Sequence, residues 1–295
     1  MRVIDIHTHG YGASGTLSSD PDDIIRMAGF HGASGVNAIL PAVYASSIPT
    51  MRRDLLTIKK AMGRQRENGA STGARKTAEI LGVHLEGPFL NPDMAGALDA
   101  GSFLPPTVDN YVRLVDGFED IVRVISIAPE IDGADALIRF LSDRGIIVSM
   151  GHSNATYAEA KAGYNAGARG VTHIFNAMRP FHHREPGIAG FALMEPGIDI
   201  EMIGDPYHLS DVTIECVFRF KDPARIILVS DMVCGPLTGD VTPAFRDDEG
   251  RLRGGSMTIP DAAKRIIGLG IDPRKVEQAI SSNPEKYLAT GLLSD

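Results

Sequence analysis

Short runs of apolar residues alternate with longer amphipathic segments along the whole chain. The short runs are rich in valine and isoleucine and end at glycine, proline or polar residues, which is typical of buried parallel strands. We predict strands at residues 3–9, 35–43, 80–86, 122–128, 146–152, 170–176, 199–204 and 225–231.

The segments between these runs have helical spacing. Apolar side chains fall on one helical face in residues 50–62 and again in residues 134–144. Alternation of strand and helix, repeated about eight times, favours a closed (β/α)8 TIM barrel over an open doubly wound sheet. The open sheet also lacks support because no glycine fingerprint for a dinucleotide follows the first strand. The length of 295 residues fits a barrel of about 250 residues with insertions, so we expect one domain over residues 1–295.

Two polar stretches interrupt the pattern, at residues 63–78 and 234–256. The second is long enough to form a lid or hairpin over a site, and a plain surface excursion is the alternative. Hydrophobic residues make up 43% of the chain and charged residues 22%, an ordinary globular balance. The net charge of -8 argues against nucleic acid as a partner, although a local arginine can still bind a small anion.

Cysteine usage and hydropathy bear on location. Cys216 and Cys234 form no CxxC motif, and we expect two free thiols in a reducing compartment rather than a disulfide. No segment approaches the ~20 apolar residues of a membrane span, and no signal peptide precedes the first strand. We therefore expect a cytoplasmic protein with no membrane partner.

Residues suited to metal binding lie at the carboxyl ends of the predicted strands. In a barrel these ends converge on one face, where active sites are built. His7 and His9 project to the same side of one strand and can together bind a divalent ion, although such a pair taken alone is more often structural. The other candidate ligands end four further strands: Glu86, His152, His173 and Asp231.

This mixture of imidazole and carboxylate groups suits Zn²⁺ or Fe²⁺ and leaves positions open for water. Asp231 can accept the proton of a metal-bound water and pass it to a leaving amine, while its alternative role is to cap the next helix. His84 shares a side of its strand with Glu86 but lies deeper, so we expect it behind the ligands or in the barrel core.

Several of these residues stand in longer strings. The strings are IDIHTHG (4–10), GVHLEGPFLNP (82–92), GHSNATYAEA (151–160), GVTHIFNAM (170–178), HREPGIAG (183–190), GGSMTIPDAA (254–263) and SNPEKYL (282–288). In order and spacing they resemble the N-acetylglucosamine-6-phosphate deacetylases of the amidohydrolase superfamily, over essentially the whole chain. The resemblance implies a metal-dependent hydrolase barrel that deacetylates an amino sugar phosphate.

The resemblance also implies roles for particular residues. Glu86, His152 and His173 resemble the main metal site of the family, and His7 with His9 resembles the pair that completes a second site, so one or two divalent ions are expected, Zn²⁺ ahead of Fe²⁺. Asp231 resembles the acid/base and a further metal ligand. The substrate-binding residues would be His208, Asn176, Ala177 and Arg184.

Arg184 resembles an arginine that reaches the phosphate across a dimer interface, which implies a homodimer. An arginine fork suits a phosphate better than a lysine would. Without the resemblance, a surface pair with Glu185 is the preferred reading of Arg184.

Three features depart from the family. The family has a flanking β-sandwich built from sequence on both sides of the barrel, and we expect it to be lacking here. Leu98 follows Gly96-Ala97 where the family has a histidine that polarises the substrate carbonyl, and Asp231-Met232-Val233 replaces the usual Asp-Ala-Met. Leucine cannot donate a hydrogen bond, so a second metal or another residue must polarise the carbonyl, or the substrate differs.

Three hypotheses follow. The first is deacetylation of N-acetylglucosamine 6-phosphate or a related N-acyl amino sugar phosphate. The second, motivated by Leu98, keeps the metal chemistry on another N-acyl or cyclic amide. The third is a catalytically silent barrel that binds a sugar phosphate or a partner protein.

Overall fold

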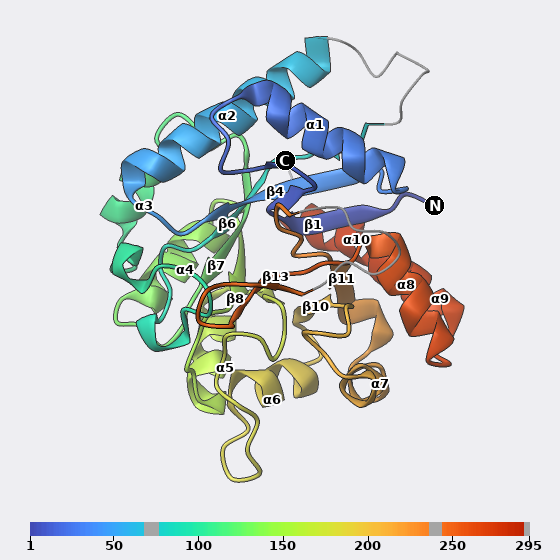
Figure 1. Ribbon diagram of the computed structural model, residues 1–295. Helices are drawn as coiled ribbons and strands as arrows, with labels where there is room; N and C mark the ends of the chain where they lie inside the picture. Colours follow the sequence, from blue (N-terminus) through green and yellow to red (C-terminus); the bar gives the residue numbers. More distant parts are fainter. Residues whose placement is uncertain (68–76, 236–243, 292–295) are drawn as a thin grey trace.

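Eight parallel strands stand around a common axis in the computed structural model, which describes residues 1–67, 77–235 and 244–291 (Figure 1). Neighbouring strands are hydrogen-bonded in the order β1 (Ile4–Thr8), β4 (Ala38–Tyr44), β6 (Val83–Glu86), β7 (Val122–Ile127), β8 (Ile147–Met150), β9 (Gly170–Val171), β10 (Asp199–Ile203) and β11 (Ile226–Val229). A short strand, β5 (Glu79–Ile80), also pairs with β4. The predicted TIM barrel is confirmed.

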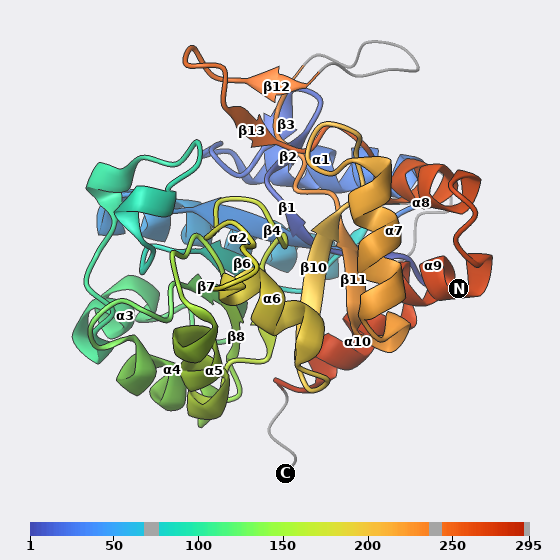
Figure 2. The ribbon, with the colours of Figure 1, turned by 90° about the horizontal axis from the view of Figure 1, so that it is seen from below.

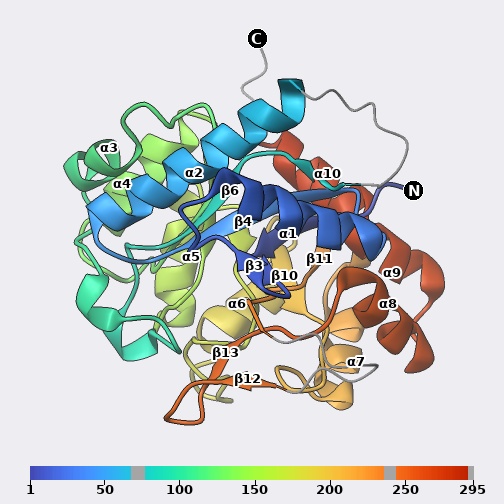
Figure 3. The same ribbon diagram turned by 45° about the horizontal axis from the view of Figure 1, so that its top comes forward.

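Helices surround this ring (Figures 1 and 3). They are α1 (Pro21–Ala33), α2 (Ile48–Glu67), α3 (Val108–Val115), α4 (Ala134–Ser142), α5 (Tyr157–Ala166), α6 (Gly187–Met194), α7 (Asp211–Phe220), α8 (Ile259–Gly268), α9 (Pro273–Ile280) and α10 (Ser282–Ala289). Both helices predicted from spacing are present, as α2 and α4. None of the described helices is long and apolar enough to cross a membrane.

Each of the eight predicted strands overlaps an observed strand, but the observed strands are shorter. The largest difference is β9, which covers only two residues of the predicted 170–176. The backbone leaves the extended conformation there because His173 and Phe175 adopt φ angles of 29° and 73°. Left-handed φ angles of this kind are incompatible with a continued strand.

The ring closes between its first and last strands. The backbone N–H of Asp231 donates to the carbonyl of His7 at 2.9 Å. The buried carboxylate of Asp5 accepts from the backbone N–H groups of His7 and Ser230 at 3.3 and 3.2 Å. Burial raises the pKa of Asp5 to about 6. These contacts form the seam between β1 and β11.

The two ends of the barrel differ. The interior is filled by apolar side chains such as Ile6, Leu40 and Val229, and Tyr287 of α10 packs with them. Figure 2 shows α10 beneath the barrel, at the end opposite β12 (Phe245–Arg246) and β13 (Leu252–Gly254). With one end plugged, the carboxyl ends of the strands are left to form a site.

The strands β12 and β13 form an antiparallel hairpin across that second end (Figures 1 and 2). This is the hairpin expected within residues 234–256, although residues 236–243 lie outside the described part of the chain. The other polar stretch, 63–78, begins as the end of α2, and residues 68–76 likewise lie outside it. Apart from the barrel sheet, the described strands form only this hairpin and a small one of β2 (Gly10–Tyr11) with β3 (Ser14–Gly15). The single-domain boundary at 1–295 stays a prediction.

Candidate metal centre and substrate cavity

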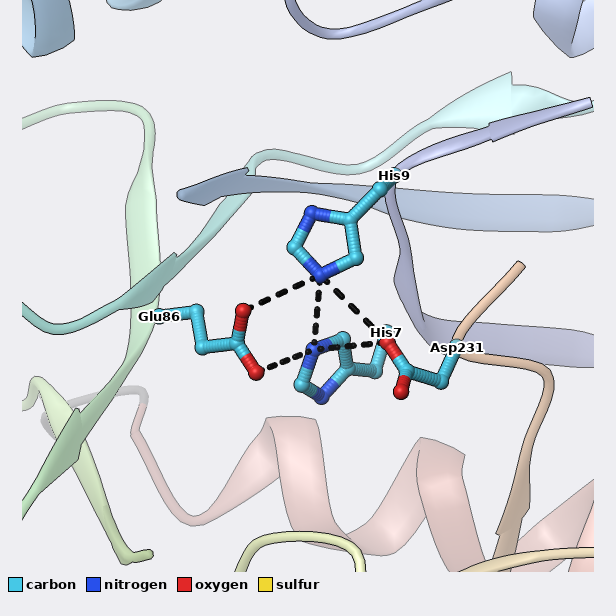
Figure 4. Close-up of side chains that lie close together, drawn as sticks. All are labelled: His7, His9, Glu86 and Asp231. Carbon is cyan, nitrogen blue, oxygen red and sulfur yellow. Dashed lines mark hydrogen bonds and ion pairs between the residues drawn. The ribbon is translucent and has the colours of Figure 1, made fainter. Parts of the chain in front are cut away.

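Four of the predicted ligands meet at the open end of the barrel (Figure 4). The Nε2 atoms of His7 and His9 lie 3.3 Å apart. His9 Nε2 lies 3.2 Å from an oxygen of Glu86 and 3.3 Å from Oδ1 of Asp231. All four residues are buried. The structure therefore brings together groups from the first, third and last strands of the barrel.

The remaining two ligands approach the other side of Glu86. Its Oε1 lies 3.1 Å from Nε2 of His152 and 3.2 Å from Nε2 of His173. Glu86 thus stands between two sets of imidazole nitrogens, one on each side. This arrangement is suited to a carboxylate that binds one ion or bridges two.

Three of these residues follow their strands in a left-handed backbone conformation. The φ angles are 46° for His152, 29° for His173 and 47° for Asp231. Such angles are uncommon for residues other than glycine and cost free energy, so they persist where surrounding structure enforces them, often at functional sites. They end each strand at the point where its side chain reaches the shared centre.

In two of the histidines, the hydrogen bond made by Nδ1 fixes the ring so that Nε2 faces the centre. Nδ1 of His9 lies 3.0 Å from the carbonyl of Ala42, and Nδ1 of His152 lies 3.0 Å from the carbonyl of Met94. Because a carbonyl only accepts, each Nδ1 carries the proton and each Nε2 presents a lone pair to the centre. Neutral imidazoles with this tautomer are the form that binds a metal. The donor set therefore fits a divalent cation.

Charge at the centre is balanced between imidazoles and carboxylates. Burial acts to lower the pKa of His7, but hydrogen bonds to Glu201 and Glu86 raise it well above its ordinary value. Burial acts to raise the pKa of Glu86, but His9, His152 and His173 hold it well below its ordinary range. Asp231 also has a lowered pKa: burial opposes this, and its hydrogen bond to His9 causes it. Both carboxylates are thus ionised, as metal ligands must be.

Sequence reasoning missed Glu201, which lies on β10 and is buried. One of its oxygens lies 3.0 Å from Nδ1 of His7. The sequence feature that could have identified it is a lone glutamate within the apolar predicted strand at residues 199–204. His84 lies behind the ligands, as predicted: its Nδ1 donates to the carbonyl of Ile6 at 3.1 Å and its Nε2 lies 2.9 Å from the hydroxyl of Ser126.

A cavity of about 550 Å³ opens above the centre. His208, Asn176, Ala177 and Leu98 line it, together with the ligands His9, Glu86, His152, His173 and Asp231. The hairpin contributes a wall that includes Arg246, Arg251 and Arg253. The predicted lid is therefore part of the cavity. Arg184 does not line this cavity and is exposed on the loop before α6.

His208 is held by a residue that sequence reasoning did not select. The carboxylate of Asp205 lies 3.0 Å from Nδ1 of His208 and also accepts the backbone N–H of Tyr207 and of His208. Burial acts to lower the pKa of His208, but this hydrogen bond to Asp205 raises it. Nδ1 is thereby occupied, and Nε2 remains for a ligand in the cavity.

Comparison with known proteins shows consistent similarity to one group of enzymes. The chain is 33% identical over 261 residues to an N-acetylglucosamine-6-phosphate deacetylase of Bacillus subtilis, covering 88% of this chain and 64% of the relative. It is 28% identical to an N-acetylgalactosamine-6-phosphate deacetylase of Escherichia coli O157:H7, covering 97% and 76%. No protein-family model matches the sequence.

Solved structures agree. An N-acetylglucosamine-6-phosphate deacetylase of Thermotoga maritima superposes with a TM-score of 0.84 at 29% identity, covering 97% of this chain and 78% of that one. A mutant of the Mycobacterium smegmatis enzyme, in complex with N-acetyl-D-glucosamine-6-phosphate, gives a TM-score of 0.84 at 27% identity, covering 98% and 77%. The chain thus spans somewhat less than two thirds of the Bacillus relative and about three quarters of these structures.

Proposed function

We propose that the chain, which is similar to N-acetylglucosamine-6-phosphate deacetylases over most of its length, hydrolyses the N-acetyl group of N-acetylglucosamine 6-phosphate or a related amino sugar phosphate. One observation carries the proposal. Six imidazole and carboxylate side chains from distant parts of the chain meet beneath a cavity large enough for such a substrate.

Glu86, His152 and His173 would hold a first cation, and His7 and His9 would complete a second site with Glu86 between them and Asp231 beside them. We propose Zn²⁺, with Fe²⁺ as the alternative, because nitrogen donors mixed with carboxylates suit both. A divalent cation supplies a Lewis acid that lowers the pKa of water and polarises a carbonyl.

Asp231 moves the proton in this proposal. Its ionised carboxylate takes a proton from the attacking water, whose oxygen bonds to the acyl carbon. The carbon–nitrogen bond then breaks, and Asp231 returns the proton to the departing amine. Acetate and an amino sugar phosphate are the products, and Asp231 ends in its starting state.

Recognition of the sugar phosphate falls to residues farther out in the cavity. We assign His208 to the sugar, because Asp205 holds its ring and leaves Nε2 available. Asn176 and Ala177, which line the same cavity, would contact the sugar phosphate.

Arg184 would reach the phosphate from a second copy of the chain, which makes the active form a homodimer. The loop that carries Arg184 projects from the barrel beside α6 (Figure 1). Phe181 on the same loop is 56% exposed, and Met194 at the end of α6 is 68% exposed. Exposed apolar side chains of this kind are suited to burial against a partner. The cytoplasmic location stays a prediction.

Acetate release tests the proposal. Protein loaded with Zn²⁺ or Fe²⁺ is incubated with N-acetylglucosamine 6-phosphate and with its galactosamine epimer, and acetate is measured. We expect turnover of one or both by the wild type and loss of about 10²–10⁴-fold in the variant Asp231→Asn. Absence of acetate from both substrates would overturn it.

Leu98 favours a second candidate, hydrolysis of another N-acyl or cyclic amide, because the cavity has leucine where the family has a polarising histidine. A panel of non-sugar amides separates the two: faster turnover of any of them than of the sugar phosphates favours the second. No turnover at all, with no metal retained on purification, would favour the silent barrel.

A further inference from the structure

The substitution at Leu98 leaves a chemical task without its usual residue. As water attacks an amide, negative charge develops on the acyl oxygen, and a hydrogen-bond donor placed there lowers the barrier. Leu98 lines the cavity but has no donor to offer. A bound cation can polarise the acyl oxygen, and another side chain of the cavity can add the hydrogen bond that Leu98 does not offer.

Tyr44 stands beside the centre. It is the last residue of β4 and pairs in register with Glu86, the central carboxylate, on the neighbouring strand. Its ring stacks on His9, with centroids 3.7 Å apart and planes 8° from parallel. The stacking holds the ring at a ligand of the candidate metal site, and the residue lines the cavity.

The hydroxyl of Tyr44 is available as a donor. None of the residues that the structure describes forms a hydrogen bond with it, and the side chain is half-buried at the cavity. A hydroxyl without a protein partner can donate to a ligand that supplies an acceptor.

Two other polar side chains of the cavity have partners already. Asn176 donates its amide to the carbonyls of His173 and Ile174. His208 is tied through Nδ1 to Asp205 and faces the sugar in the proposed function. Tyr44 differs from both because its ring stacks directly on a ligand.

We propose that Tyr44 is a further catalytic residue, whose hydroxyl donates a hydrogen bond to the acyl oxygen of the substrate as the tetrahedral intermediate forms. The inference rests on the proposed function, and it supplies the donor that the family takes from its loop histidine. Tyr44 keeps its proton throughout. Asp231 still transfers the proton from water to the amine, and the acyl oxygen becomes a carboxylate oxygen of the acetate product.

The variant Tyr44→Phe removes only the hydroxyl and keeps the ring that stacks on His9. We expect kcat to fall about 10²-fold or more, with KM changed less than about threefold, because the lost bond acts mainly on the transition state. Metal content and melting temperature should match the wild type, which separates this role from a structural one. Tyr11→Phe, a tyrosine outside the cavity lining, is the matched control and should leave kcat unchanged.

Binding supplies a second readout. A phosphonamidate analogue of N-acetylglucosamine 6-phosphate mimics the tetrahedral intermediate, and glucosamine 6-phosphate is the product. Calorimetry on metal-loaded protein should show that Tyr44→Phe weakens the analogue about 10-fold or more and the product less than twofold. Equal weakening of both, or of neither, would overturn the role of Tyr44.

Failure of the inference differs from failure of the proposed function. If wild type and Tyr44→Phe release acetate at equal rates, the inference is wrong and the function stands. If the wild type releases none, the proposed function is wrong, and the analogue measurement alone then decides whether Tyr44 recognises a tetrahedral centre.

Discussion

His7, His9 and His152 each use both ring nitrogens, one toward the centre and one toward a fixed acceptor. For His9 and His152 the acceptor is a backbone carbonyl, which no side-chain substitution removes. For His7 it is the carboxylate of Glu201. A substitution at Glu201 can therefore change the orientation of His7 without replacing any of the candidate metal ligands.

The variant Glu201→Ala should weaken cation binding about 10–100-fold, because His7 loses the acceptor that fixes its ring and its tautomer. Titration of metal-free protein with Zn²⁺, followed by calorimetry, measures the change. Glu79→Ala, which removes an exposed glutamate paired with Arg2, is the control and should bind as the wild type does. Unchanged affinity in Glu201→Ala would contradict the role given to Glu201.

His31, a buried histidine outside the candidate site, makes the stability of the fold depend on pH. His31 is buried in α1 with one ring nitrogen 3.1 Å from the hydroxyl of Thr8, and burial lowers its pKa to about 3 from 6.5. Between these values the unfolded chain binds a proton that the folded chain does not, so stability falls as the pH falls below 6.5. From about pH 7 to about pH 5 this residue should cost about 2 kcal/mol of unfolding free energy.

Urea denaturation of the wild type and of His31→Gln at both pH values measures this cost as the difference between the two losses. Equal losses in both proteins would show that His31 does not sense the acid.

The candidate ligands could be predicted because their chemistry is visible in the sequence: histidines and carboxylates closing apolar strands. Glu201 and Tyr44 could not be predicted in the same way. Glu201 lies within an apolar strand and Tyr44 at the end of one, and only the folded structure shows which side chains they contact.

At the scale of elements, the hairpin is fixed to the barrel at its carboxyl end. The backbone N–H of Gly255 donates to the carbonyl of Asp231 at 2.7 Å. A Cβ atom at Gly255 would lie 1.9 Å from the carbonyl oxygen of Ser230, a backbone atom that cannot rotate away. The hairpin therefore packs against the end of β11 so closely that no side chain fits at Gly255.

Gly255→Ala should consequently lower the free energy of unfolding by about 1–3 kcal/mol through this clash and reduce turnover, because Asp231 is displaced. Thermal melting and acetate release measure the two effects. Gly63→Ala, in α2 and with open space around the added atom, is the control and should stabilise by about 0.5–1 kcal/mol. A Gly255→Ala protein with wild-type stability and turnover would contradict the packing described.

Element type was predictable from periodicity, and element length was not. The apolar run at 170–176 has the composition of a full strand, yet β9 has two residues. The left-handed turns of His173 and Phe175 end it, and such backbone angles leave no mark in a hydrophobic pattern.

For the whole molecule, the candidate centre couples cation binding to stability. The ligands come from positions between His7 and Asp231 and meet only in the folded chain. A cation at about 100 times its dissociation constant should add about 2.7 kcal/mol and raise the melting temperature by about 4–5 °C. Scanning calorimetry with and without Zn²⁺ measures this, and the double variant His152→Ala with His173→Ala should lose most of the shift. No shift in the wild type with Zn²⁺ or Fe²⁺ would contradict the metal centre.

The seam between β1 and β11 has a consequence for biosynthesis. During synthesis His7 and His9 emerge before the other ligands, and the strand that pairs with them at the seam follows only after more than two hundred further residues. Until then one edge of the first strand is unpaired and the ligand set is incomplete. The full ligand set can therefore bind a cation only after the final strand has docked against the first.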